Sequence, residues 1–128
     1  MLLGRWRPVQ PAPPSHECLA LLTCLPLRFY REEPILLLCE PLVLRELRTT
    51  DGLFGYAMWT QPLAKRFWTL SAWEGEASLQ AFIQRPPHLG AVARLAPHLA
   101  GARFLRWSVR GAELPLSWGA AMRRFGDA

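Results

Sequence analysis

Two aromatic-rich segments joined by four residues place the strongest constraint on how this chain can fold. Residues 53–61 and 66–74 are rich in aromatic, β-branched and small side chains, and only residues 62–65 separate them. Runs of this composition with so short a link favour an antiparallel β-hairpin. If the four linking residues form the loop, Gln61 pairs with Arg66, and the register of the whole hairpin follows.

That register divides the hairpin into two faces of different character. Because side chains alternate across a strand, one face is wholly apolar and suits helix packing. Its members are Gly55, Ala57, Trp59, Trp68, Leu70 and Ala72. The other face mixes aromatic side chains with hydroxyls, and its pairs are Phe54 with Trp73, Tyr56 with Ser71 and Met58 with Thr69.

The remaining predicted elements come before and after the hairpin in the sequence. Residues 17–25 form a compact apolar run that suits a buried strand. A helix is predicted over 34–48, where Pro41 leaves two alternatives: a kink, or a short turn before a helix over 41–49. After the hairpin the pattern predicts a helix over 76–85, a second helical piece opening at His88, a strand over 102–109 and a terminal helix over 117–125.

This β-α-β-β-α-β order predicts an α+β, ferredoxin-like fold. Such a fold has a four-stranded antiparallel sheet with helices on one face, and here a C-terminal helix follows it. The uncovered face would carry Phe54, Tyr56, Met58 and Trp73, a patch that a monomer would not leave in water. We therefore expect a homodimer formed through the sheet faces.

Length and composition bound the class of protein. The chain has 128 residues, of which 51% are apolar, and this is enough for one packed core. Four of the twelve prolines lie in residues 1–15. We therefore expect a proline-rich arm over residues 1–15 and a single domain over 16–128. No apolar run approaches the roughly 18 residues of a membrane span. Prolines in the arm interrupt any signal-peptide core, so we expect a soluble, cytoplasmic protein with no membrane partner. The net charge of +5 comes from dispersed arginines, which favours a solvated surface over nucleic-acid binding.

The three cysteines show no metal-binding or disulfide pattern. Cys18, Cys24 and Cys39 are odd in number, none belongs to a CxxC pair, and no histidine cluster accompanies them. Buried free thiols fit this pattern better. We expect no metal and no cofactor.

The second hairpin strand and the segment after it resemble a known superfamily. Residues 67–74 read Phe-Trp-Thr-Leu-Ser-Ala-Trp-Glu, and the helix after them contains Glu-Ala-Ser-Leu-Gln-Ala-Phe before a Pro-His pair. The Asp-Gly-Leu-Phe-Gly-Tyr turn at 51–56 and Trp-Ser-Val-Arg-Gly at 107–111 add to the likeness. Together these motifs resemble the dimeric α+β barrel superfamily, which includes the antibiotic-biosynthesis-type monooxygenases. The resemblance implies a homodimer with a cavity in each subunit between sheet and helices.

The resemblance also implies a small apolar or aromatic ligand, and cofactor-independent oxygenation of a phenolic or polycyclic substrate is one activity of the superfamily. His88 follows the break at Pro86-Pro87, and its imidazole could act as acid or base near neutral pH. The residues expected to line the pocket are Tyr56, Trp68, Thr69, Ser71, Trp73 and Arg106. The alternative is that His88 is bonded to a nearby carbonyl at a helix start and that the others are ordinary core residues.

The sequence also bears on three other functions. Haem-degrading members of the superfamily resemble a pattern of Trp followed ten residues later by His, whereas this chain has Phe82 and Val92 there, and valine cannot ligate iron. A non-catalytic ligand-binding or interaction module stays open, and so does the question of whether the protein is an enzyme. An RNA-recognition domain shares the element order, but residues 52–58 echo its motif only faintly and in the wrong strand.

Overall fold

The computed structural model describes residues 2–28, 45, 47, 50–61, 63–85 and 101–127. Four long strands form the body of its sheet: β3 (Glu17–Pro26), β4 (Leu53–Gln61), β5 (Arg66–Trp73) and β6 (Arg103–Arg110). They lie antiparallel in the order β4-β5-β3-β6. The predicted α+β, ferredoxin-like fold is confirmed, and the first predicted strand lies in the centre of the sheet.

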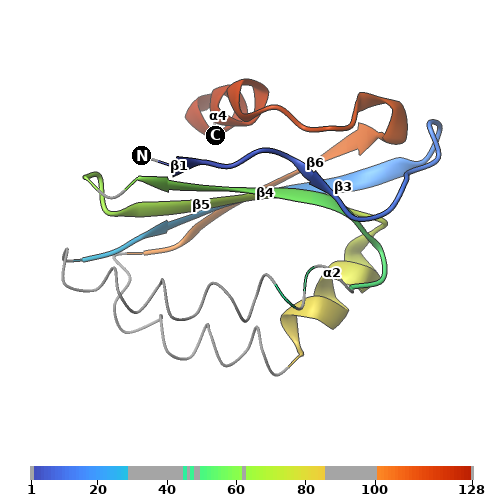
Figure 1. Cartoon of the computed structure of the whole chain (residues 1–128), viewed down its shortest axis with the longest axis horizontal. Helices are drawn as coiled ribbons and strands as arrows, with labels where there is room; N and C mark the ends of the chain where they lie inside the picture. Colours follow the sequence, from blue (N-terminus) through green and yellow to red (C-terminus); the bar gives the residue numbers. More distant parts are fainter. Residues whose placement is uncertain are drawn as a thin grey trace.

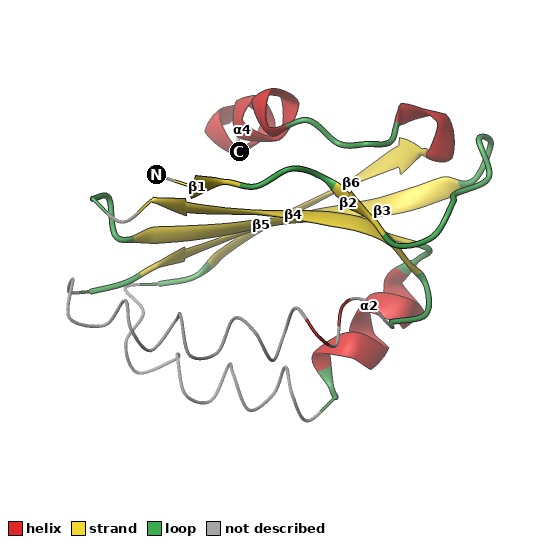
Figure 2. Cartoon of the chain, viewed as in Figure 1, coloured by secondary structure: helices red, strands yellow, loops and turns green. Residues whose placement is uncertain are grey.

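Helices cover this sheet from both sides (Figures 1 and 2). Helix α2 (Glu76–Ile83) packs below the sheet in the view of Figure 1. Helix α4 (Trp118–Asp127) lies above it and is reached through the 3-10 turn η3 (Gly111–Glu113). No helix within the described ranges is long and apolar enough to cross a membrane. Of the helix predicted over 34–49, the structure describes Arg45 and Leu47, and both are helical; the helical piece predicted from His88 onward lies outside the described residues.

The N-terminal arm adds two short strands to the sheet. β1 (Leu2–Leu3) and β2 (Arg7–Pro8) both pair antiparallel with β4, and between them the Gly4 N–H donates to the Met58 carbonyl at 2.7 Å. The prediction of a four-stranded sheet therefore needs correction. The proline-rich arm can pair in this way because an outermost strand tolerates a residue that lacks an N–H.

The predicted hairpin register is confirmed over most of its length. Pairs from Gln61–Arg66 to Gly55–Ala72 are those expected from a loop of residues 62–65. The prediction that Phe54 faces Trp73 is wrong, because an irregularity between Leu53 and Gly55 places Leu53 opposite Trp73. An extra residue of this kind is a β-bulge, and it shifts one side chain to the other face of the strand.

The sheet therefore separates two hydrophobic layers. The layer on the α2 side is built on Leu21, Leu53, Tyr56, Trp73, Leu79 and Phe82. The layer on the α4 side holds Cys18, Ala20, Leu22, Phe54, Trp68, Leu70 and Ala121, with Trp6, Trp59 and Trp107 packed against them.

The expectation of one open sheet face is wrong for this chain. Tyr56 and Trp73, which the sequence predicts on a face open to a second subunit, are instead buried under α2. Their relative solvent exposures are 3% and 2%. The wholly apolar face does pack a helix as expected, but that helix is α4, with the arm beside it. The sequence interpretation failed here because it treated both ends of the chain as peripheral to the core.

Candidate functional site

The four long strands bring predicted site residues into one row on the α2 face. Arg106 of β6 pairs with Leu21 of β3, Leu21 pairs with Ser71 of β5, and Ser71 pairs with Tyr56 of β4. Residues directly opposite each other in a sheet project to the same face. The row therefore places a guanidinium at one edge and a phenol near the other, with a hydroxyl between them.

Ser71 is the polar centre of this row. Its Oγ accepts a hydrogen bond from Trp73 Nε1 at 2.9 Å, and both side chains are buried. The centroid of the Trp73 ring lies 5.4 Å from that of Phe82, which belongs to α2. Because Ser71 Oγ accepts the indole hydrogen, its own hydroxyl hydrogen is the one it can donate to a bound group.

A second row adds more hydroxyl groups to the same face. Thr23 of β3 lies opposite Thr69 of β5, and Thr69 lies opposite Met58 of β4. Thr23 is buried, whereas Thr69 and Met58 are half-buried. A mostly apolar surface with a few hydroxyls is the usual character of a site for a small organic molecule.

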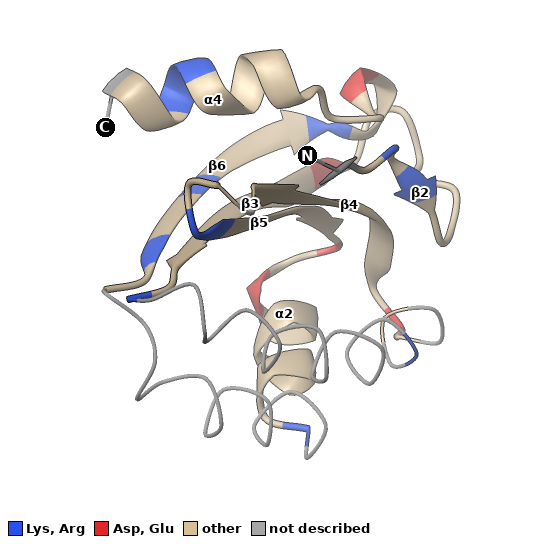
Figure 3. Ribbon diagram, turned by 60° about the vertical axis from the view of Figure 1, so that its left-hand side comes forward, with Lys and Arg blue, Asp and Glu red and all other residues tan. Residues whose placement is uncertain are grey.

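Arg106 is held at the edge of the site by helix α2. Its Nη1 lies 2.6 Å from a carboxylate oxygen of Glu76, which also accepts a hydrogen bond from Gln80. These hydrogen bonds, from Gln80 first and then Arg106, lower the pKa of the Glu76 carboxyl from its ordinary value. Figure 3 shows arginines spaced along β6 and acidic residues at the start of α2. Sequence reasoning missed Glu76, because a helix-start acid carries no signal of a distant partner.

Trp68 does not belong to this group of residues. It lies on the α4 face, where its Nε1 donates to Gln61 Oε1 at 2.7 Å and its ring meets that of Phe125 at 5.0 Å. The correction follows from strand geometry, because the neighbours Trp68 and Thr69 must point to opposite faces.

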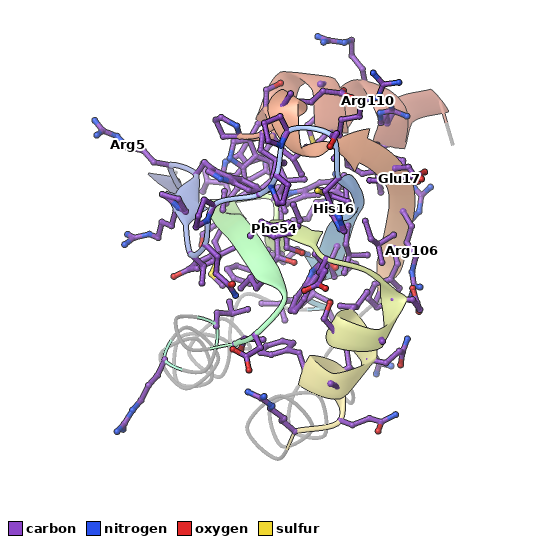
Figure 4. The ribbon with its side chains drawn as sticks, turned by 90° about the vertical axis from the view of Figure 1, so that its right-hand side faces the viewer. Arg5, His16, Glu17, Phe54, Arg106 and Arg110 are labelled. Carbon is purple, nitrogen blue, oxygen red and sulfur yellow. The ribbon has the colours of Figure 1, made fainter. Side chains whose placement is uncertain are left out.

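Two histidines bear on the candidate site. His88, the predicted acid or base, lies outside the described residues. His16, which sequence reasoning passed over, places Nε2 2.9 Å from the Glu74 carbonyl oxygen and its ring edge-on to Phe54 (Figure 4). These contacts tie the end of the arm to the β5–α2 connection.

Metal ligands and reactive thiols do not gather in the part of the chain that the structure describes. No group of three His, Cys, Asp or Glu side chains there could hold a metal ion. Cys18 and Cys24 are free and buried, and burial raises the pKa of both thiols. Both thiols therefore stay protonated and weakly nucleophilic near neutral pH.

Comparison with known proteins finds the same fold among solved structures. The sequence matches no family model and no curated protein. A dimeric ferredoxin-like protein of unknown function from Thermobifida fusca superposes with a TM-score of 0.61 at 18% identity, covering 73% of this chain and 92% of that one. An antibiotic biosynthesis monooxygenase gives a TM-score of 0.62 at 14% identity, covering 71% and 97%.

A third match is to a longer protein. A proposed monooxygenase from Fusobacterium nucleatum has a TM-score of 0.68 at 7% identity, and the match covers 84% of this chain and 51% of that one. This chain thus spans about half the length of that protein. At such identities the likeness establishes the fold, and it confirms the resemblance to dimeric α+β barrel proteins at that level.

Proposed function

We propose that the protein binds a small aromatic or polycyclic molecule on the α2 face of the sheet and oxygenates it without a cofactor. The observation that carries the proposal is the buried Ser71 hydroxyl, which accepts a hydrogen bond from Trp73 and lies opposite Tyr56 on a mostly apolar sheet face. Indole and phenol rings offer flat contacts to an aromatic ligand. A hydroxyl at their centre can donate to a phenolate oxygen.

The proposed reaction uses dioxygen as the only oxidant. A methylene group of a phenolic substrate, acidified by the adjoining rings, loses a proton and transfers electrons to dioxygen. One oxygen atom becomes the new carbonyl, and the other leaves as water with the two hydrogens of the methylene. The protein's part is to exclude water and to hold the ionised phenol, which Ser71 and Arg106 would do from the same row. Fold relatives named as monooxygenases support this class of chemistry.

Ser71→Ala tests the site with 1-naphthol as the probe. Loss of one hydrogen bond to the naphthol oxygen should weaken binding by about three- to tenfold, measured by calorimetric titration. Ser108→Ala is the matched control. Ser108 of β6 lies on the same face of the sheet as Ser71, but it is exposed at the sheet edge. Equal affinities for the Ser71 and Ser108 variants, or no binding by the wild type, would contradict the proposal.

Oxygen consumption separates the enzyme from the binding module. Uptake of dioxygen with a methylene-bearing phenolic substrate supports oxygenation, whereas naphthol binding without uptake supports a non-catalytic ligand-binding protein. An RNA platform gains no support from the rings that suggested it. Phe54 and Tyr56 lie on opposite faces of β4, so their rings cannot form one platform for stacked bases.

Association of two copies is a separate part of the proposal. A fold relative is named as dimeric, which supports a homodimer here as well. In the described structure, however, both sheet faces are covered within one chain. A homodimer through the sheet faces would therefore require part of this cover to move.

A further inference from the structure

The outer edge of β6 is a long part of the described sheet that has no partner strand. β6 lies at the end of the strand order, and it pairs with β3 in an unbroken register from Arg103 opposite Cys24 to Arg110 opposite Glu17. Within the described ranges, the backbone of residues 103–109 forms no hydrogen bond outside the ladder with β3. The strand contains neither a proline nor a bulge, two devices that close exposed edges in other sheets. A regular edge of this kind is a template to which an extended chain can add.

One hydrogen bond fixes the direction of the backbone groups along β6. The Gly111 N–H donates to the His16 carbonyl at 2.9 Å, and these two residues extend the register that places Arg110 opposite Glu17. Opposed residues joined by such a bond point their backbone groups at each other, and the direction alternates along the strand. Odd-numbered residues of β6 therefore face β3, and even-numbered residues face outward. Arg110 agrees with this assignment, because its N–H donates to the side chain of Glu113 and not to β3.

The outward backbone groups that an added strand could reach belong to Phe104, Arg106 and Ser108. Their side chains lie on the α2 face, where Arg106 ends the row described above. All three are exposed, and the relative exposure of Phe104 is 65%. Leu105 and Trp107, which alternate with them, are half-buried on the α4 face. An added strand would therefore meet exposed side chains on the α2 face and apolar ones on the α4 face.

The side chains along β6 favour a negatively charged partner. The strand carries three arginines and no acidic residue, and the whole chain has a net charge of +5. Arg106 already binds one carboxylate, because its Nη1 lies 2.6 Å from an oxygen of Glu76. A guanidinium also has N–H groups on Nη2 and Nε, which can bind a second carboxylate. The edge thus combines outward backbone groups with an affinity for acidic side chains.

We propose that the outer edge of β6 binds an extended acidic segment of another protein, which adds to the sheet as an antiparallel strand. An aspartate or glutamate of that segment lies opposite Arg106, on the α2 face. The residues on either side of it are apolar, because they project to the α4 face beside Leu105 and Trp107. Main-chain hydrogen bonds at the outward residues of β6 give affinity, and the alternation of acidic and apolar side chains gives specificity.

A short peptide of alternating valine and glutamate, capped at both ends, is the probe for this edge. Fluorescence anisotropy of the labelled peptide should show saturable binding that weakens as salt is raised. Replacing its glutamates by glutamines should weaken binding by about three- to tenfold, because the hydrogen bonds to Arg106 lose their charge. N-methylation of the glutamates, whose N–H groups would face β6, should abolish binding. N-methylation of the valines, whose N–H groups would face solvent, should leave it intact.

Ser108→Pro tests the same contact from the side of the protein. Proline removes the outward N–H of this residue but no bond of the ladder with β3, so the sheet should stay intact. Ser108→Ala is the matched control, because it keeps the N–H. The affinity for the valine–glutamate peptide should fall at least about tenfold in Ser108→Pro and stay unchanged in Ser108→Ala. Both variants should bind 1-naphthol like the wild type, so the peptide test can fail independently of the proposed function.

Hydrogen exchange of the wild-type protein decides the matter even if Ser108→Pro fails to fold. In the free protein, the outward amides of Phe104, Arg106 and Ser108 should exchange at least about tenfold faster than the inward amides of Leu105 and Trp107. The valine–glutamate peptide should slow the outward amides to the rate of the inward ones.

Three results would overturn the proposal. Slow exchange of the outward amides in the free protein would show that another segment or a second copy already occupies the edge. Peptide binding that slows no amide of β6 would show attraction by charge alone. Equal peptide affinities for folded Ser108→Pro and Ser108→Ala, or no binding by the wild type, would show that the edge accepts no such strand.

Discussion

At the scale of single residues, Gly55 shows how closely the arm approaches the sheet. A Cβ atom added at this position would lie 2.5 Å from the Trp6 ring, so only glycine lets the indole rest flat on β4. Trp6 in turn packs against both clusters of the α4 layer. One missing methyl group therefore decides whether the arm can close over this part of the sheet.

Gly55→Ala should destabilise the protein by about 1–3 kcal/mol, because either the Trp6 ring or the β4 backbone must shift. The free energy of unfolding in urea measures the effect. Gly126→Ala serves as the control, since a Cβ at Gly126 meets no atom within 4 Å. A helical alanine there should leave stability unchanged or raise it by up to about 1 kcal/mol. Equal stability of Gly55→Ala and wild type would mean that Trp6 does not lie on β4.

At the scale of elements, the bond between α2 and β6 depends on one carboxylate. Glu76 begins α2 and accepts from Arg106 of β6, and its pKa is lowered from 4.5. A group whose pKa is lower in the folded than in the unfolded state stabilises the fold above the unfolded pKa. That contribution is lost as the pH falls through the folded value.

The melting temperature of Glu76→Gln should therefore lie below that of wild type near neutral pH, and the difference should vanish in acid. Because the pair is exposed, the effect should be small and should shrink further at high salt. Arg106→Gln should give a similar loss, and combining the two changes should cost little more than either alone. A difference that persists unchanged in acid would assign the effect of Glu76 to packing rather than charge.

Elements were predictable from sequence where a local rule decided the outcome. The hairpin register followed from the four-residue link, and β3 followed from an apolar run of strand length. The bulge at Phe54 was not predictable, because Leu53 and Phe54 are both apolar and either could face Trp73. Residue type groups Trp68 with Thr69 as pocket residues, whereas strand alternation places the two on opposite faces.

At the scale of the whole molecule, the two ends of the chain form one layer. Trp118 of α4 donates to Gly4 of the arm, and Trp6 packs in the same cluster as Trp118. Sequence reasoning could not foresee this contact, because no local pattern links residues that are more than a hundred positions apart. The same long-range contact explains why the sheet has no open face.

A double-mutant cycle measures how strongly the two ends depend on each other. Trp6→Ala and Trp118→Ala should each destabilise the protein, and the double variant should lose less than the sum of the two by about 0.5–1.5 kcal/mol. Unfolding in urea, followed by circular dichroism, gives the free energies. Strict additivity would show that the arm and α4 cover the sheet independently.

Because β1 and β2 pair with β4, the described sheet has one long unpaired edge, that of β6. A sheet that is free on both sides can polymerise, because every added copy offers a fresh edge to the next. Here the arm occupies the β4 side with backbone of the same chain, and within the described ranges β6 pairs only with β3. A copy that joined along β6 would turn its capped side outward, so growth would terminate at two molecules. The paired arm therefore leaves the described part of the sheet one long edge, that of β6, to which another strand could add.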